Sequence, residues 1–244
     1  LAHLYVSNEE YRNHFLEVRK RENSFILLDN GAAENSLVNE DTLIEIVKEL
    51  KPDEVIAPDV IHDSLNTVAN LITFVERMKV DNLLEHTNIF FCPQGQDMED
   101  WLYCYLVGLN IEEVSTIGLS KIALPHCMFK ASNDTMIASA RFRTVKGLHS
   151  LGLIRKPLHL LGAETPLEFL SHPVYNEVRS TDSCFTVWGA MNGHDWEDSL
   201  TNNWSIPARV PTPHDYFDLE LTEEARELAL KNINFLKSRL PLDS

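Results

Sequence analysis

Carboxylate or amide side chains stand at or near the ends of four short apolar runs, as Asp29, Asp59, Gln94 and Asp182. A carboxylate can act as a nucleophile or as a general acid or base, and an amide can hold a polar substrate by hydrogen bonds. One such aspartate alone is more often a helix cap or a turn residue. Because the pattern recurs along the chain, the sequence predicts one site at which these four side chains meet.

The apolar runs have the character of buried strands. Most of them are apolar without alternation, which is typical of strands covered on both faces in a parallel sheet. The seven expected strands are residues 4–6, 25–29, 54–59, 89–94, 114–120, 158–162 and 178–184. Segments 41–50, 65–78 and 97–108 lie between them and have apolar residues at the spacing of a helix. Repeated strand–helix units predict either a doubly wound sheet or a barrel.

Two features favour the barrel. No strand is followed by a GxGxxG or GxxxxGK[ST] loop, and polar residues close several strands, whose ends a barrel gathers around one mouth. The 244 residues are close to the roughly 250 of one barrel, so we expect a single (β/α)₈ TIM-barrel domain over residues 1–244. The eighth strand is unassigned and falls either in 185–190 or before Leu1. Residues 192–216 have no period, and Thr222 is expected to cap a last helix.

Composition sets further limits. No apolar run approaches the roughly 18 residues of a membrane span, and no signal peptide is recognisable, so we expect a cytoplasmic protein without a membrane partner. The four cysteines are widely spaced, which argues against a disulfide framework and a structural zinc site. The net charge of −16 argues against broad affinity for phosphate backbones. A local basic face is still compatible with this charge, and the most basic stretch contains Arg141, Arg143 and Lys146.

The strand-end motifs occur in a definite order. They are Leu28-Asp29-Asn30-Gly31, Asp59, Gln94-Gly95, Gly118-Leu119, the turn from Leu160 to Pro166, and Asp182 with Cys184. This series, from about Phe25 to Asp182, resembles the tRNA-guanine transglycosylases (queuine tRNA-ribosyltransferases). Within that family it is most similar to the compact phage and bacterial relatives that insert 7-deazaguanines into DNA. A phage protein of this kind would act in the host cytoplasm.

The resemblance implies a role for each matched residue. Asp182 attacks C1′ of the nucleotide, and Asp29 protonates the departing base and deprotonates the incoming one. Asp59 accepts hydrogen bonds from the base, while Gln94 and the Gly118 N–H hold its O6. Leu119 and Gly162 complete the substrate-binding set. The implied activity replaces guanine in DNA with a 7-deazaguanine such as preQ0, through a covalent aspartyl–nucleotide intermediate and without a cofactor.

The chain departs from the family in two places. The CxCxxC cluster that binds zinc in the tRNA enzymes is absent, and there is no room for the insert that carries it. We therefore expect no metal and favour DNA over tRNA as the target. The Ser-Gly-Gly-Phe turn of the family reads Asn30-Gly31-Ala32-Ala33 here, which leaves Asp29 less supported than Asp182. Asp63 rivals Asp59 as the base-reading carboxylate, but its place suggests a helix cap.

Other residues and other functions remain open. Arg141, Arg143 and Lys146 are candidates for phosphate contacts, and Trp188 is a candidate for stacking on a base. We expect structural roles for the histidines at 62, 126, 159 and 172. The alternatives are a transglycosylase acting on tRNA, a carboxylate-based glycoside hydrolase or metal-dependent hydrolase, and a non-catalytic barrel subunit. A homodimer is also compatible with the sequence.

Overall fold

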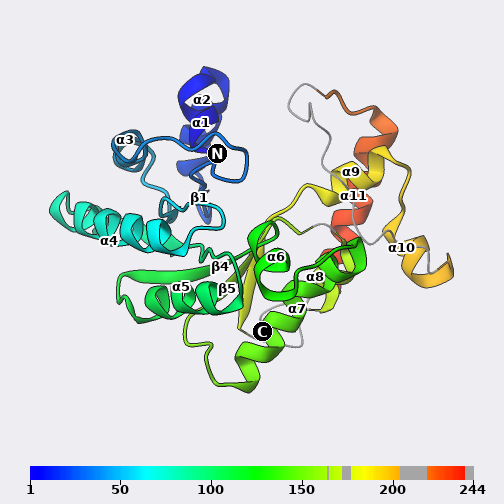
Figure 1. The fold of residues 1–244 in the computed structure, drawn as a ribbon. Helices are drawn as coiled ribbons and strands as arrows, with labels where there is room; N and C mark the ends of the chain where they lie inside the picture. The colour runs from blue at the N-terminus through cyan, green and yellow to red at the C-terminus, as the bar shows by residue number, and fades with distance from the viewer. Residues whose placement is uncertain (164, 172–176, 204–218, 240–244) are drawn as a thin grey trace. The chain divides into compact units, whose positions relative to one another are not determined.

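The protein has an α/β fold built on six parallel strands (Figure 1). The computed structural model describes residues 1–163, 165–171, 177–203 and 219–239. The strands lie in the sheet in the order in which they occur in the chain. They are β1 (Leu27–Leu28), β2 (Glu54–Ile56), β3 (Asn88–Phe91), β4 (Val114–Ser120), β5 (Leu158–Leu161) and β6 (Val178–Thr181). An eight-stranded closed barrel stays a prediction.

Helices connect the consecutive parallel strands. The helices before β5 are α1 (Ala2–Ser7), α2 (Glu9–Arg19), α3 (Glu40–Leu50), α4 (Ser64–Val80), the 3-10 helix η1 (Leu83–Glu85), α5 (Met98–Asn110), α6 (Ala123–Phe129) and α7 (Asp134–Ser150). Those after β5 are α8 (Pro166–Ser171), α9 (Phe185–Met191), α10 (Trp196–Asp198), the π-helical turn η3 (Ser199–Asn203) and α11 (Glu223–Lys237). This alternation is the one that the periodicity of the sequence predicts.

The contacts within the chain divide it into two compact units. Unit 1 contains Leu1–Met128 and Arg155–Pro157, and unit 2 contains Phe129–Ile154 and Leu158–Ser244. Strands β1 to β4 belong to unit 1, and β5 and β6 belong to unit 2. The candidate site residues fall in both units, so their surroundings are described one unit at a time.

Unit 1 has a core of strand residues covered by helices. Ile89, Phe90 and Phe91 of β3 are fully buried, and α4 packs against α5. Each of these helices starts at a side-chain cap. Asp63 accepts a hydrogen bond from the Asn66 N–H at 3.0 Å at the start of α4. Asp97, Asn39 and Thr222 cap α5, α3 and α11 in the same way, so the predicted caps at Asp63 and Thr222 are confirmed.

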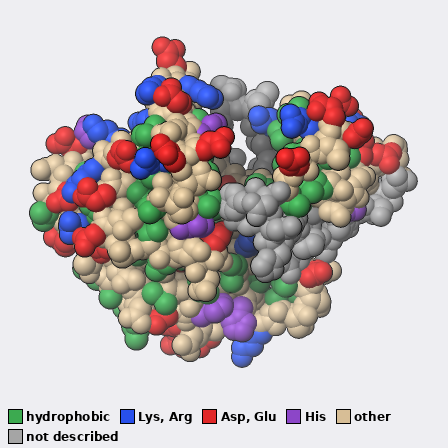
Figure 2. Space-filling view, turned by 90° about the horizontal axis from the view of Figure 1, so that it is seen from above, with side chains coloured by type: hydrophobic (Ala, Val, Ile, Leu, Met, Phe, Trp, Pro, Cys, Tyr) green, Lys and Arg blue, Asp and Glu red, His purple; other side chains and the backbone are tan. Residues whose placement is uncertain are grey.

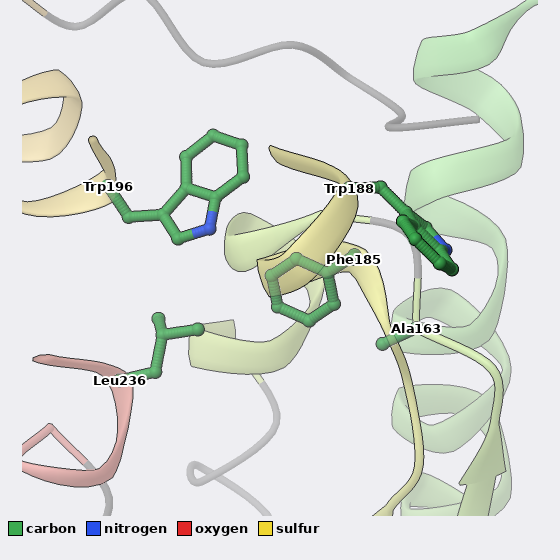
Figure 3. Packing of buried hydrophobic residues seen from close by; sticks show 5 residues of the cluster. All are labelled: Ala163, Phe185, Trp188, Trp196 and Leu236. Carbon is green, nitrogen blue, oxygen red and sulfur yellow. The ribbon is translucent and has the colours of Figure 1, made fainter. Parts of the chain in front are cut away.

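Unit 2 has an aromatic core beside β5 and β6. Figure 3 shows the five buried members of this cluster, which come from the turn after β5 and from α9, α10 and α11. They are Ala163, Phe185, Trp188, Trp196 and Leu236. Helix α11 packs against α9 and α10, so the last helix is part of this core. Burial of such large aromatic side chains contributes strongly to the stability of the unit.

Several predicted elements are wrong in type or extent. Residues 4–6 belong to helix α1 and not to a strand. Three apolar residues are too few to distinguish the 3.6-residue period of a helix from the two-residue period of a strand. Ala2 and Tyr5, about one helical turn apart, are the buried residues of this helix. Residues 185–190 form α9, where Phe185, Trp188 and Gly189 share one buried face, so they are not the eighth strand. Part of the non-periodic stretch 192–216 is helical, as α10 and η3, and residues 204–216 lie outside the described residues.

The surface of the described residues carries both signs of charge. On the face shown in Figure 2, acidic side chains are spread widely and basic side chains lie among them. The sequence has 37 Asp and Glu against 21 Lys and Arg, so the acidic side chains dominate. In the part of the chain that the structure describes, no helix combines the length and the apolar character needed to cross a membrane.

Candidate active site

The polar residues predicted at strand ends in unit 1 do lie there. Asp29 directly follows β1, and Asp59 and Gln94 are each the third residue after β2 and β3. The carboxyl ends of parallel strands share one edge of a sheet, so these loops lie next to one another. The glycine after Gln94 has a packing reason, because a Cβ on Gly95 would lie 2.5 Å from the backbone nitrogen of Trp101. The start of α5 therefore fits closely against the Gln94 loop.

Asp59 is the centre of a buried hydrogen-bonded cluster in unit 1. Its side chain accepts a hydrogen bond at each oxygen, from the Asn30 amide at 2.8 Å and from the Gln94 amide at 2.5 Å. Asn30 also donates to the Ala57 carbonyl at 2.9 Å, and its own carbonyl accepts from the Ala32 N–H. We call Asn30, Asp59 and Gln94 the amide–carboxylate cluster. It joins the loops after three consecutive strands.

Burial controls the charge of this cluster. Loss of hydration raises the pKa of Asp59 to about 6, although the hydrogen bonds from Asn30 and Gln94 oppose the rise. The negative charge of Asp29 raises this pKa further. Asp59 is therefore mostly ionised at pH 7 and can accept hydrogen bonds from a ligand that presents donors.

The stability of the protein should depend on pH through Asp59. Since its pKa is higher in the folded protein than the ordinary 3.8, the folded state binds the proton more tightly. The contribution of Asp59 to the free energy of unfolding is complete below pH 4 and is lost as the pH rises through about 6. At 1.36 kcal/mol for each pH unit, the loss is about 2–3 kcal/mol. Urea titrations between pH 4 and 7 measure the free energy of unfolding of wild type and of Asp59→Asn. The difference between the two proteins should change by this amount over the range, and a difference that does not change with pH would contradict the prediction.

Asp29 lies in a second acidic part of unit 1. Its carboxylate accepts a hydrogen bond from the Gly31 N–H at 2.7 Å, which closes the turn after β1. Burial and the charge of Asp29 raise the pKa of Glu34. Asp29 and Glu34 are thus close enough to affect each other, and an additional acidic side chain could share proton transfer with Asp29.

Gly118 and Leu119, both expected to contact substrate, lie in β4. Both residues are buried, and Leu119 has no exposed surface. Ser120 ends the strand, and its hydroxyl accepts hydrogen bonds from the N–H groups of Ile122 and Ala123. The Gly118-Leu119 pair therefore stands within the strand, before its carboxyl end.

Asp182 is held in unit 2 through the Oδ1 oxygen of its carboxylate. Its Oδ1 accepts hydrogen bonds from His159 Nε2 at 2.9 Å and from the Gly162 N–H at 3.0 Å. Its Oδ2 has no hydrogen-bond partner among the described residues, and 60% of the side chain is exposed. Gly162 has φ of 67°, a conformation that favours glycine and that turns its N–H toward Asp182. One carboxylate oxygen is therefore anchored, while the described residues leave the other without a bound group.

The residues around Asp182 also determine the direction in which its pKa is shifted. Removal of water by the surrounding protein raises its pKa, but the hydrogen bond and charge of His159 lower it, as do the Gly162 N–H and Arg141. The net effect places the pKa of Asp182 below its ordinary value. Asp182 is therefore an ionised carboxylate at neutral pH, as a nucleophile must be.

Arg141 supports the turn that holds Asp182. Its guanidinium pairs with Glu168 at 2.5 Å and donates to the carbonyls of Leu161 and Gly162 at 2.6 and 3.1 Å. Both charged side chains are almost completely buried, with 2% and 3% exposed. The expected phosphate contact is therefore not available to Arg141, because its donors are turned into unit 2.

Breaking this ion pair should destabilise the protein. In Glu168→Gln the Arg141 guanidinium keeps its charge but loses the buried carboxylate that compensates it. We expect a loss of about 3–5 kcal/mol in the free energy of unfolding, measured by urea denaturation at pH 7. The matched control is Glu197→Gln, because Glu197 pairs with Lys231 on the surface at 3.4 Å and should cost less than about 1 kcal/mol. Equal losses in the two variants would contradict this assignment.

Among the other predicted nucleic-acid contacts, two side chains are exposed and one is buried. Arg143 and Lys146 are exposed on α7, and the Arg143 guanidinium lies 5.8 Å from the centre of the Phe129 ring. Trp188 is buried in the aromatic core, so it is not placed to stack on a base. Cys184, which follows Asp182 closely, is an exposed thiol.

Comparison with protein-family models and with curated proteins does not identify a family for this chain. No protein-family model matches it, and no curated protein does.

Two residues of the site were missed or undervalued in the sequence. His159 was expected to be structural, yet it binds Asp182, and the available signal was a histidine inside the apolar strand β5. The sequence indicates Asn30 only as part of a turn, although its side chain binds Asp59. Of the other histidines, His62 donates its backbone N–H to Gln94 and its ring lies 5.0 Å from that of His126, while His172 lies outside the described residues.

Proposed function

We propose that this protein is a base-exchange transglycosylase that replaces guanine in DNA with a 7-deazaguanine. The observation that supports this most directly is the geometry of Asp182. Its Oδ1 is fixed by His159 and Gly162, its Oδ2 is unpaired among the described residues, and its side chain is largely exposed. An ionised carboxylate held in this way suits nucleophilic attack better than a structural role.

The chemistry of base exchange requires such a group. Displacement at the anomeric carbon of a nucleotide passes through an oxocarbenium-like state, for which a carboxylate is a suitable nucleophile. Oδ2 of Asp182 attacks C1′ and forms an ester while the guanine departs. An incoming base then attacks the same carbon and releases the carboxylate.

The amide–carboxylate cluster suits recognition of the base. A guanine edge presents donors at N1 and N2 and an acceptor at O6. The ionised carboxylate of Asp59 complements the donors, and the amide of Gln94 complements the acceptor. An adenine edge would present its N1 acceptor, in place of the guanine N1 donor, to the ionised Asp59 carboxylate, at a cost of roughly 1–3 kcal/mol. Asp29 acts as the general acid and base of the proposed reaction.

The (β/α)₈ barrel is part of this proposal. In that fold the carboxyl ends of all strands surround one mouth, and the active site lies there. The six parallel strands in chain order agree with this arrangement. A base inside a duplex cannot reach such a site, so the target nucleotide must be flipped out or presented in a single strand. Arg143 and Lys146 are the exposed basic residues of α7 that remain candidates for phosphate contacts.

Incubation with labelled preQ0 and either DNA or tRNA, followed by mass spectrometry of the nucleosides, tests the proposal. We expect label in DNA. Label in tRNA alone would support the family activity but correct the target. Release of guanine without incorporation would indicate a hydrolase instead. Absence of both products with any 7-deazaguanine would overturn the proposal.

A further inference from the structure

His159 connects Asp182 to a second polar residue of the same strand segment. Its Nε2 lies 2.9 Å from Asp182 Oδ1, and its Nδ1 lies 2.8 Å from the Ser180 hydroxyl. The register of β5 on β6 pairs His159 with Ser180. Since alternate residues of a strand point to the same side, residues 180 and 182 reach the two nitrogens of one ring. Only 4% of His159 is exposed, so the ring is fixed between them.

The partners of the ring determine where its protons are. The ionised Asp182 carboxylate can only accept a hydrogen bond, so His159 Nε2 carries a hydrogen and donates it. The Ser180 hydroxyl can donate to Nδ1 when the ring is neutral and can accept from it when the ring is charged. The ring therefore keeps its contact with Asp182 in either charge state. Oδ1 receives two donors, from His159 and from Gly162, while Oδ2 has no hydrogen-bond partner in the part of the chain that the structure describes.

We propose that His159 is a positioning residue that promotes the release of Asp182 from its covalent intermediate. This inference rests on the proposed function. In the first step an electron pair of Asp182 Oδ2 forms the bond to C1′, and the pair of the C1′–N9 bond leaves with guanine, which takes a proton from Asp29. In the second step the incoming base gives its N9 proton to Asp29 and bonds to C1′. The pair of the C1′–Oδ2 bond then returns to the carboxylate, and His159 donates to Oδ1 throughout without losing its proton.

The two steps respond differently to this hydrogen bond. A donor binds a carboxylate oxygen more strongly than it binds the carbonyl oxygen of an ester, because the carboxylate is charged. The donors at Oδ1 therefore stabilise Asp182 as a leaving group and make it a slightly weaker nucleophile. Loss of the His159 donor should therefore prolong the covalent intermediate, while its formation should be as fast as in wild type or slightly faster.

Single-turnover kinetics with the full chain can separate the two steps. DNA is first mixed with the protein, and the rate at which the covalent adduct appears is followed on denaturing gels. Excess preQ0 is then added, and the lifetime of the adduct is measured. In His159→Phe, which has no donor, we expect the lifetime to lengthen about tenfold or more, with a smaller change in the rate of formation. His159→Gln can place an amide nitrogen near the position of Nε2 and should restore most of the wild-type lifetime.

A second substitution at His159 keeps the test possible if the first variant does not fold. If His159→Phe does not fold, His159→Asn replaces it, because its shorter amide can reach Ser180 but not Asp182. An unchanged adduct lifetime in the donor-less variant, or no recovery in His159→Gln, would overturn the inference while the transglycosylase proposal stands. If wild type forms no adduct with DNA or tRNA, both proposals fail.

Discussion

Replacing Asp182 by asparagine should abolish base exchange and leave the protein folded. Asparagine has the same shape and keeps a carbonyl oxygen that can accept hydrogen bonds from His159 and Gly162. It lacks the negative charge that attacks C1′, so the rate of exchange should fall by about a thousandfold or more. The covalent adduct on denaturing gels should disappear with it. Incorporation of labelled preQ0 measures the loss directly.

The matched control for this variant is Asp195→Asn. Asp195 lies in the same unit, caps α10 and pairs with Lys231 at 2.6 Å on the surface. Asparagine is an equally good helix cap, so this variant should retain exchange and adduct formation. Comparable thermal unfolding of the two variants would show that the loss in Asp182→Asn is chemical. Full activity of Asp182→Asn would contradict the role of Asp182, and would favour a different nucleophile or a supporting subunit.

The sequence predicts those features that depend on residues close to one another along the chain. Strand β4 has the bounds that its apolar run predicts, because a buried parallel strand needs apolar residues on both faces. The caps Asp63 and Thr222 were predictable, since a cap bonds an N–H only three residues away. The placement of Asp29, Asp59 and Asp182 just after strands followed from the same alternation of apolar runs and polar residues.

The partners of the site residues could not be predicted in the same way. Arg141 and Glu168 are 27 residues apart, and nothing local to either one indicates a buried ion pair. His159 meets Asp182 only because β5 and β6 pair in one particular register, and a shift of one residue would turn the ring to the other face. The contact of Asn30, which follows β1, with Asp59, which follows β2, likewise depends on the pairing of these two strands. Sequence patterns thus indicate which residues are candidates for the site, while the contacts between strands show which partners hold their side chains.

Binding of the incoming base should depend on the charge of Asp59. The ionised carboxylate accepts hydrogen bonds from the N1 and N2 donors of the base, whereas the protonated form offers a donor in the same place. Since the pKa of Asp59 is raised to about 6, affinity should be constant from pH 7 to 8 and fall by about tenfold for each pH unit below 6. Calorimetric titration with preQ0 between pH 5 and 8 measures this dependence.

A substitution separates this effect from general acid sensitivity. Asp59→Asn should bind preQ0 about 10–100-fold more weakly at pH 7, because an amide hydrogen replaces one acceptor, and its affinity should vary little between pH 5 and 7. Asp63→Asn is the matched control, since Asp63 is a helix cap four residues away and its replacement should keep the wild-type pH profile. A wild-type affinity that is flat across this range would show that Asp59 does not read the donors of the base. The carboxylate beside Asn30 and Gln94 would then serve the fold of unit 1, and the base would have to be recognised by other residues.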